Sequence, residues 1–185
     1  MRNARHLLYI TMILCPLLAA AQDKLATRNG VITFFSSTPM EDITAVNSKV
    51  ASVLVPSSGA IEFSALVKAF EFRKAMMQEH FNEDYMESDK FPKAFFKGKV
   101  MPPTGDDLSR PGIHAVSVEG DLTMHGVTRH LTVPATLTTA ADGSVKAVCD
   151  FKVKPIDYGI TVPSVVREKI ADTLDLKVQI TYIKL

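Results

Sequence analysis

Apolar and polar side chains alternate along most of this chain, and the alternation is clearest between residues 116 and 137. A period of two residues predicts a β-strand with one buried face and one face in water. The pattern breaks at His125-Gly126 and then resumes, so we expect a hairpin with its turn there. The apolar face of this hairpin contains Val116, Val118, Leu122, Met124, Val127, Leu131, Val133, Ala135 and Leu137.

Similar segments recur along the chain and predict about eight strands. They cover residues 31–38, 43–55, 60–67, 94–101, 114–124, 127–138, 145–153 and 174–182. Turn-forming pairs such as Asn29-Gly30, Pro111-Gly112 and Asp142-Gly143 separate them. Eight strands close into a barrel that is either filled by its own side chains or holds one small ligand. The expected fold is therefore all-β, an eight-stranded antiparallel barrel.

Two segments do not alternate. Residues 73–81 place apolar side chains at helical spacing, which predicts a short amphipathic helix in an insertion, and residues 164–171 predict one more helical turn. The stretch from Phe70 to Phe96 is rich in phenylalanine and methionine, and methionine adapts to irregular apolar partners. These groups either plug one end of the barrel or contact an apolar ligand, and the pattern leaves both open.

The first residues are typical of a secretory signal peptide. Arg2 and Arg5 precede an apolar run from Leu7 to Leu18, and Ala19-Ala20-Ala21 offers a cleavage site. About a dozen apolar residues fall short of the roughly 20 that span a bilayer. We therefore expect residues 1–21 to be removed and residues 22–185 to form one exported domain.

The composition of the remaining chain excludes several classes of protein. Cleavage removes two arginines, so the 21 basic residues fall to 19 against 20 acidic ones and the net charge becomes −1, which gives no basis for nucleic-acid binding. Cys149 is then the lone cysteine, so no internal disulfide forms. It shares its parity with Val145 and Ala147, and we expect it to be a small buried apolar residue.

No residue pattern indicates catalysis or metal binding. His80, His114, His125 and His130 are scattered, and paired cysteines and a nucleophile elbow are absent from the sequence. His125 and Arg129 lie at a tight turn and His130 lies on the polar parity of its strand, so we interpret these as solvated or turn residues. The polar run at 36–38 is better explained as a strand end followed by a turn. We expect no catalytic residues, no metal and no cofactor.

Three motifs resemble the YceI family across essentially all of the mature chain. They are TFFSSTPMEDI at 33–43, FEFRKAMMQEHFNEDYMESDKFPKAFFKG at 70–98 and VEGDLTMHGVTRHLTVP at 118–134. The resemblance implies a lipocalin-like barrel in the bacterial periplasm that binds a polyisoprenoid or similar long amphiphile, with no catalytic residues established. The chain departs from the family at one position. Many members have an Arg-x-Asp-aromatic-Gly element near the end of the domain, and here Pro155 occupies the position of its arginine. The identity of the family's ligand is therefore not transferred to this chain.

Parity and position, together with this resemblance, predict the residues of a ligand site. We expect His80 and Tyr85 to contact a head group. The predicted apolar lining consists of Phe34, Phe63, Phe72, Met76, Phe81, Val118, Leu122 and Leu131.

Two other functions stay open at this point. A barrel with a filled core could serve as a protein-interaction module through the apolar middle segment. A small outer-membrane barrel also alternates, but the absence of Trp and the presence of only four Tyr disfavour its aromatic girdles. The sequence does not indicate the head group, the tail length, or whether a lipid is transported, stored or sensed. It leaves the oligomeric state open, with a homodimer as one alternative.

Overall fold

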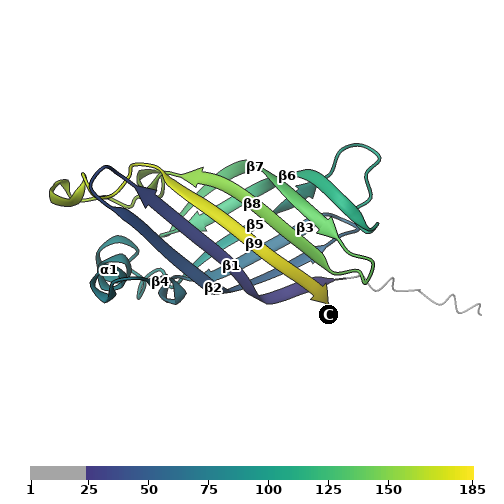
Figure 1. Cartoon of the computed structure of the whole chain (residues 1–185), viewed down its shortest axis with the longest axis horizontal. Coiled ribbons are helices and arrows are strands. Elements are labelled where there is room, and N and C mark those ends of the chain that lie inside the picture. The colour runs from purple at the N-terminus through teal and green to yellow at the C-terminus, as the bar shows by residue number, and fades with distance from the viewer. Residues whose placement is uncertain (1–23) are drawn as a thin grey trace, which may run out of the picture.

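The computed structural model describes residues 24–185, so the predicted signal peptide at 1–21 lies outside the described residues. The described chain forms one nine-stranded sheet in which every pairing is antiparallel (Figure 1). Strand β1 pairs with both β9 and β2, which closes eight long strands into a barrel. The predicted fold is confirmed. The strands are β1 (Leu25–Ser37), β2 (Asp42–Val55), β3 (Ala60–Leu66), β4 (Glu71–Phe72), β5 (Lys93–Met101), β6 (Gly112–Met124), β7 (Val127–Thr139), β8 (Val145–Val153) and β9 (Leu174–Lys184).

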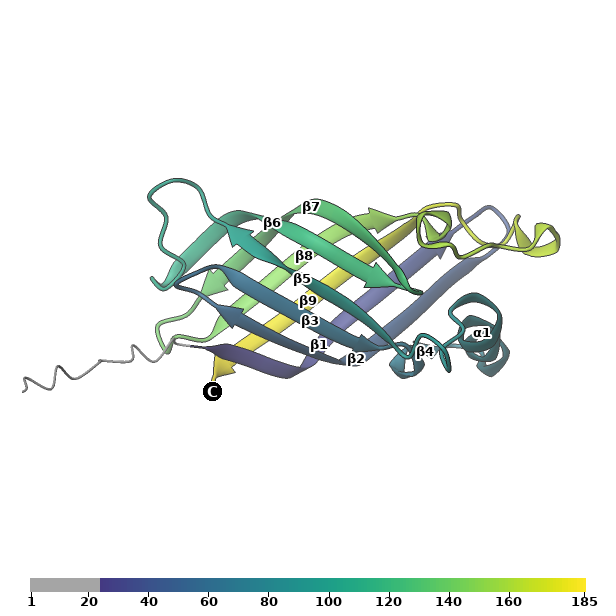
Figure 2. The ribbon, with the colours of Figure 1, turned by 180° about the vertical axis from the view of Figure 1, so that it is seen from behind.

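Helical segments gather at one end of the barrel, which we call the mouth (Figures 1 and 2). They lie in the insertion between β3 and β5 and in the connection between β8 and β9. The predicted helix at 73–81 is α1 (Ala75–His80), which continues as a π-helical turn, η2 (Phe81–Tyr85). The helical turn expected at 164–171 is shorter, η4 (Ser164–Val166). The other two are η1 (Val67–Ala69) and η3 (Pro155–Tyr158).

The loop between β5 and β6 lies at the opposite end (Figure 1), which we call the closed end. Leu108 in this loop is 4% exposed and packs into the main core cluster. Thr139 Oγ1 donates a hydrogen bond of 2.9 Å to the Leu108 carbonyl oxygen. His114 Nδ1 lies 2.8 Å from Asp106 Oδ1, and its Nε2 lies 3.0 Å from the Arg110 carbonyl oxygen. These contacts hold the loop against the barrel.

Strand β1 differs from its prediction, because it begins at Leu25 rather than at residue 31. The Asn29-Gly30 pair lies inside the strand, where the pairing of β1 with β2 shifts register. Such a shift marks a β-bulge. A Cβ atom at Gly30 would collide with the Ile180 side chain, so glycine allows the two strands to approach closely. The Asn29-Gly30 pair, which we predicted as a turn before the strand, therefore marks a β-bulge within it.

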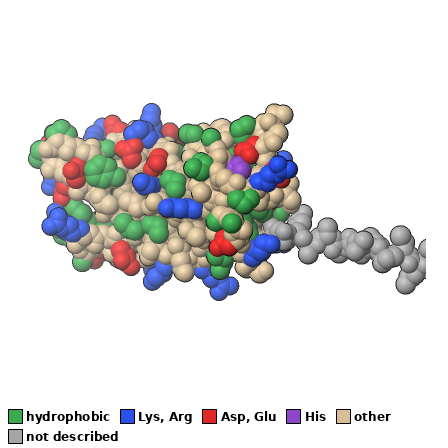
Figure 3. All heavy atoms as spheres, turned by 45° about the vertical axis from the view of Figure 1, so that its right-hand side comes forward, with side chains coloured by type: hydrophobic (Ala, Val, Ile, Leu, Met, Phe, Trp, Pro, Cys, Tyr) green, Lys and Arg blue, Asp and Glu red, His purple; other side chains and the backbone are tan. Residues whose placement is uncertain are grey.

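The hairpin of β6 and β7 confirms the predicted alternation. His125 and Gly126 adopt φ angles of 51° and 75°, as a two-residue hairpin turn requires. Val116, Val118 and Leu137 are buried, whereas Glu119 and Asp121 are exposed. On the face of the molecule drawn in Figure 3, acidic and basic side chains are interspersed with apolar ones.

Candidate functional site

The barrel encloses a cavity of about 190 Å³, which we call the inner cavity. All the residues around it are apolar, and they come from β1, β3 and every strand from β5 to β9, with additions from the mouth. Six of the predicted lining residues surround it; they are Phe34, Phe63, Phe81, Val118, Leu122 and Leu131. Their role as ligand contacts stays a prediction.

Two glycines on neighbouring strands help to keep the inner cavity hollow. Gly98 and Gly120 are paired directly across β5 and β6. A Cβ atom built on either would come within 2.8 Å of the Phe96 ring, so the ring occupies the space that the missing side chains leave. Phe96 also packs at 6.0 Å, edge to face, against Phe63. Both rings therefore lie along the wall of the cavity.

A second cavity of about 360 Å³, the outer pocket, lies at the mouth. It contains the other four predicted site residues: Phe72, Met76, His80 and Tyr85. Phe72 and Met76, which we predicted as lining of the barrel interior, therefore line the outer pocket instead. The two volumes together fall in the range of small-molecule sites, roughly 300–1,000 Å³.

Charged groups line the outer pocket, in contrast to the inner cavity. Lys74 Nζ lies 2.7 Å from Glu41 Oε1, and Lys169 lines the same pocket. The hydrogen bond from Lys74, with the nearby charges of Lys74 and Lys169, lowers the pKa of Glu41. Burial, with a smaller effect of Asp84, raises the pKa of Tyr85. This pocket can accept a polar group.

Sequence reasoning missed Glu41, Lys74 and Lys169 as site residues. Glu41 lies in the turn between β1 and β2, Lys74 in the insertion and Lys169 in the β8–β9 connection, so the three come together only where these segments meet at the mouth. No periodicity in the sequence reports that arrangement.

Aromatic rings lie where the two cavities meet. Phe34 and Phe81 line both cavities. The Phe81 ring lies 5.7 Å from Phe34, 5.6 Å from Phe70 and 4.9 Å from Phe72, measured between centroids. A molecule that occupies both cavities must therefore pass beside Phe81.

The His125 side chain joins three parts of the mouth. Its Nε2 lies 2.9 Å from Glu87 Oε2 in the insertion, and its Nδ1 lies 3.1 Å from the Tyr158 carbonyl oxygen in η3. His125 is a turn residue, as expected, but its side chain is only 12% exposed and is therefore not solvated. The contacts with Glu87 and Tyr158 fix the insertion to the rim, an arrangement that alternation along one strand cannot indicate.

Two other predicted positions also face the cavities. Cys149 faces the inner cavity, as its parity predicts, but it is half-buried rather than fully buried; this burial raises the pKa of its thiol to about 11. Pro155 is buried and lines both cavities, so this position contributes apolar wall. The peptide carbonyl of Asp157 accepts a hydrogen bond of 2.8 Å from Arg129 Nε.

Between residues 24 and 185, no three metal-binding side chains converge on one point, and no helix is long and apolar enough to cross a membrane.

Comparison with known proteins places this geometry among related barrels. The family model of the YceI-like domain matches residues 24–182. A polyisoprenoid binding domain from Saccharophagus degradans, implicated in plant cell wall breakdown, is 13% identical with a TM-score of 0.76, and the match covers 89% of this chain and 99% of that one. No curated protein matches the sequence.

Two further solved structures share the fold. BcnA from Burkholderia cenocepacia is 16% identical with a TM-score of 0.68, covering 83% of this chain and 96% of that one. A YceI protein from Campylobacter jejuni is 14% identical with a TM-score of 0.55, covering 100% and 91%.

Proposed function

Because the chain belongs to the YceI-like domain family, we propose that it binds a long-chain isoprenoid or a similar lipid-like amphiphile. The tail occupies the inner cavity, and the polar head lies in the outer pocket near His80 and Tyr85. One observation carries this proposal: a cavity with an entirely apolar lining adjoins a pocket with charged groups. A relative whose structure is described as a polyisoprenoid binding domain supports the ligand class.

The energetics favour the tail as the source of affinity. Each methylene that leaves water contributes about 0.8 kcal/mol, so about ten of them give a gross gain of about 8 kcal/mol. Lost translational freedom and ordering of the ligand reduce this gain. The few polar groups at the mouth then select the head.

The function is one of binding rather than catalysis, and it takes place after export to the periplasm. Residues 1–21 provide the signal for export. In that compartment a cavity that hides a hydrocarbon tail from water serves transport, storage or sensing of the lipid.

The test compares bound lipid in two variants on one strand. Leu131 lines the inner cavity, whereas its neighbour Thr132 is exposed on the opposite face of β7. The full chain is expressed in bacteria with its own N-terminal segment, purified, extracted with organic solvent and analysed by mass spectrometry. We expect lipid in the native protein and in Thr132→Lys and its loss in Leu131→Lys. Equal lipid content in both variants would contradict the proposal.

The alternative functions give different results in the same preparation. A barrel that acts as a protein-interaction module yields no lipid from the native protein. An outer-membrane barrel stays with the membrane after osmotic shock, whereas we expect release without detergent. The outward charges of Asp175 and Lys177 on β9 already disfavour the apolar outer band that such a barrel needs.

A further inference from the structure

The inner cavity ends inside the barrel, before the closed end. Its deepest residues include Leu137, Ala147 and Ile180, which are paired with one another across β7, β8 and β9. The next inward row on the same strands consists of Thr139, Val145 and Tyr182, and none of these lines the cavity. The cavity therefore stops between two rows of one sheet.

The lower row is packed solid. Tyr182 is 0% exposed, and its hydroxyl group lies 2.7 Å from Ser52 Oγ on β2, two strands from β9 around the barrel. Ser52 Oγ in turn donates a hydrogen bond of 2.8 Å to the Glu62 carbonyl oxygen. Val145, which is paired with Tyr182, is fully buried, and so are Val50 and Val100 of the same core cluster. We call the layer around Tyr182 and Ser52 the floor.

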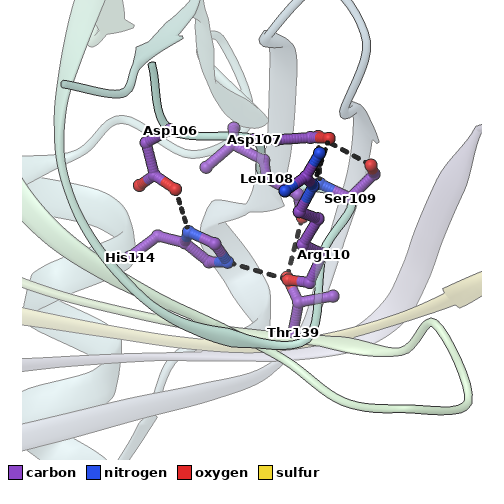
Figure 4. Close-up of polar contacts among 7 residues, drawn as sticks. All are labelled: Asp106, Asp107, Leu108, Ser109, Arg110, His114 and Thr139. Atoms are coloured by element: carbon purple, nitrogen blue, oxygen red, sulfur yellow. Dashed lines mark hydrogen bonds and ion pairs between the residues drawn. The ribbon is translucent and has the colours of Figure 1, made fainter. Parts of the chain in front are cut away.

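The closed end provides a second barrier beneath the floor. Leu108 packs there, and the loop that carries it is held by Thr139 and His114 (Figure 4). The inner cavity is thus blind, because a ligand tail that enters at the mouth has no exit at the other end.

The depth of the inner cavity follows from strand geometry. Ile180 lies six residues after Leu174 on β9, and both line the cavity. At about 3.3 Å per residue and a strand tilt of roughly 40°, this span corresponds to a depth of about 15 Å. The same six-residue span separates Val118 from Met124 on β6. The hydrocarbon core of a bilayer is about 30 Å thick, so one leaflet measures about 15 Å.

We propose that the floor around Tyr182 and Ser52 measures the ligand tail and limits it to about the length of one bilayer leaflet. This inference rests on the proposed function, since it specifies the tail of the same ligand. A longer tail must fold back or leave its end in the outer pocket. Tyr182 and the row above it thereby determine specificity for tail length.

The experiment titrates the full chain, after organic extraction and refolding, with straight-chain fatty alcohols that lengthen by two carbons per step. Binding is measured by calorimetry. We expect the affinity of the native protein to rise with each step and then to stop rising at the length that reaches the floor. An affinity that continues to rise well beyond one leaflet's length would overturn the proposal.

Three variants locate the limit. Tyr182→Ala removes the floor ring and should move the limit at least one step longer, whereas Tyr182→Phe keeps the ring and should leave the limit unchanged. Ala147→Leu fills the deepest row and should move the limit at least one step shorter, and it tests the inference independently if Tyr182→Ala does not fold. An identical limit in the native protein, Tyr182→Ala and Ala147→Leu would refute the floor as the measuring element while leaving the proposed function intact. If alcohols of every length fail to bind, the proposed function itself fails, and this inference with it.

Discussion

The buried pair of Tyr182 and Ser52 gives a sharp prediction about stability, because the direction of its hydrogen bonds is fixed by a third group. Ser52 Oγ–H donates to the Glu62 carbonyl oxygen at 2.8 Å, so the hydrogen of the Tyr182 hydroxyl group must donate to Ser52 Oγ. Burial also raises the pKa of Tyr182, which keeps the phenol protonated. The two single substitutions are therefore unequal.

The magnitudes follow from what each substitution leaves behind. Tyr182→Phe removes one hydrogen bond, but the Ser52 hydroxyl keeps its acceptor, so the free energy of unfolding should fall by about 1 kcal/mol. Ser52→Ala removes the hydrogen bond to the Glu62 carbonyl oxygen, worth about 1 kcal/mol, and also leaves the Tyr182 hydroxyl as a buried donor without an acceptor, which costs about 1–3 kcal/mol more. The double variant should be less stable than Tyr182→Phe by only the Ser52–Glu62 hydrogen bond, because the orphaned donor is then gone.

Urea unfolding followed by circular dichroism measures all four proteins of this double-mutant cycle. A loss of 1 kcal/mol should lower Tm by about 2–4 °C in a domain of this size. The reasoning is refuted if Tyr182→Phe destabilises the protein more than Ser52→Ala does, or if the two effects simply add in the double variant.

Three further predictions concern other residues of the barrel. Because burial raises the pKa of Cys149 to about 11, its thiol should react with a disulfide reagent at pH 8 far more slowly than after unfolding in urea, and equal rates would contradict its burial. Hydrogen bonds to Asp121, and to a smaller extent to Glu119, raise the pKa of His130 above its ordinary value. The contribution of protonated His130 to the stability of the fold is therefore present at low pH and is lost as the pH rises through this pKa. An NMR titration of His130 should show a lower midpoint in Asp121→Asn than in the native protein. Leu122→Asp, in the inner cavity, should eliminate copurifying lipid, whereas Met76→Asp, at a residue 64% exposed in the outer pocket, should retain part of it, and lipid extraction with mass spectrometry would reveal the opposite order.

Much of the fold could be predicted because each strand carries its own alternation. The positions from Leu174 to Tyr182 are read correctly from local sequence, since inward and outward faces differ at every step. The start of β1 could not be predicted in this way. In the sequence, Asn29-Gly30 has the pattern of a turn. In the structure, glycine is needed at position 30 because the Ile180 side chain packs closely against it, and Ile180 lies on β9, far away in the sequence.

The distinction between a hollow and a filled interior lies beyond alternation altogether. Ile180 and Tyr182 have the same parity on the same strand, yet one lines the inner cavity and the other belongs to the floor. The difference arises from contacts between strands: the Tyr182 hydroxyl group meets Ser52 on β2, while the Phe96 ring lies over the two glycines on β5 and β6. Similarly, the charged groups of the outer pocket come together only when the insertion folds over the mouth.

Native mass spectrometry of the freshly purified full chain, expressed with its own N-terminal segment, tests the central claim most directly. The apolar cavity should carry one lipid-like molecule per chain, seen as an added mass that disappears after organic extraction. The same spectrum reports whether the chain forms a homodimer. A spectrum that shows the polypeptide mass alone, before any extraction, would contradict the account.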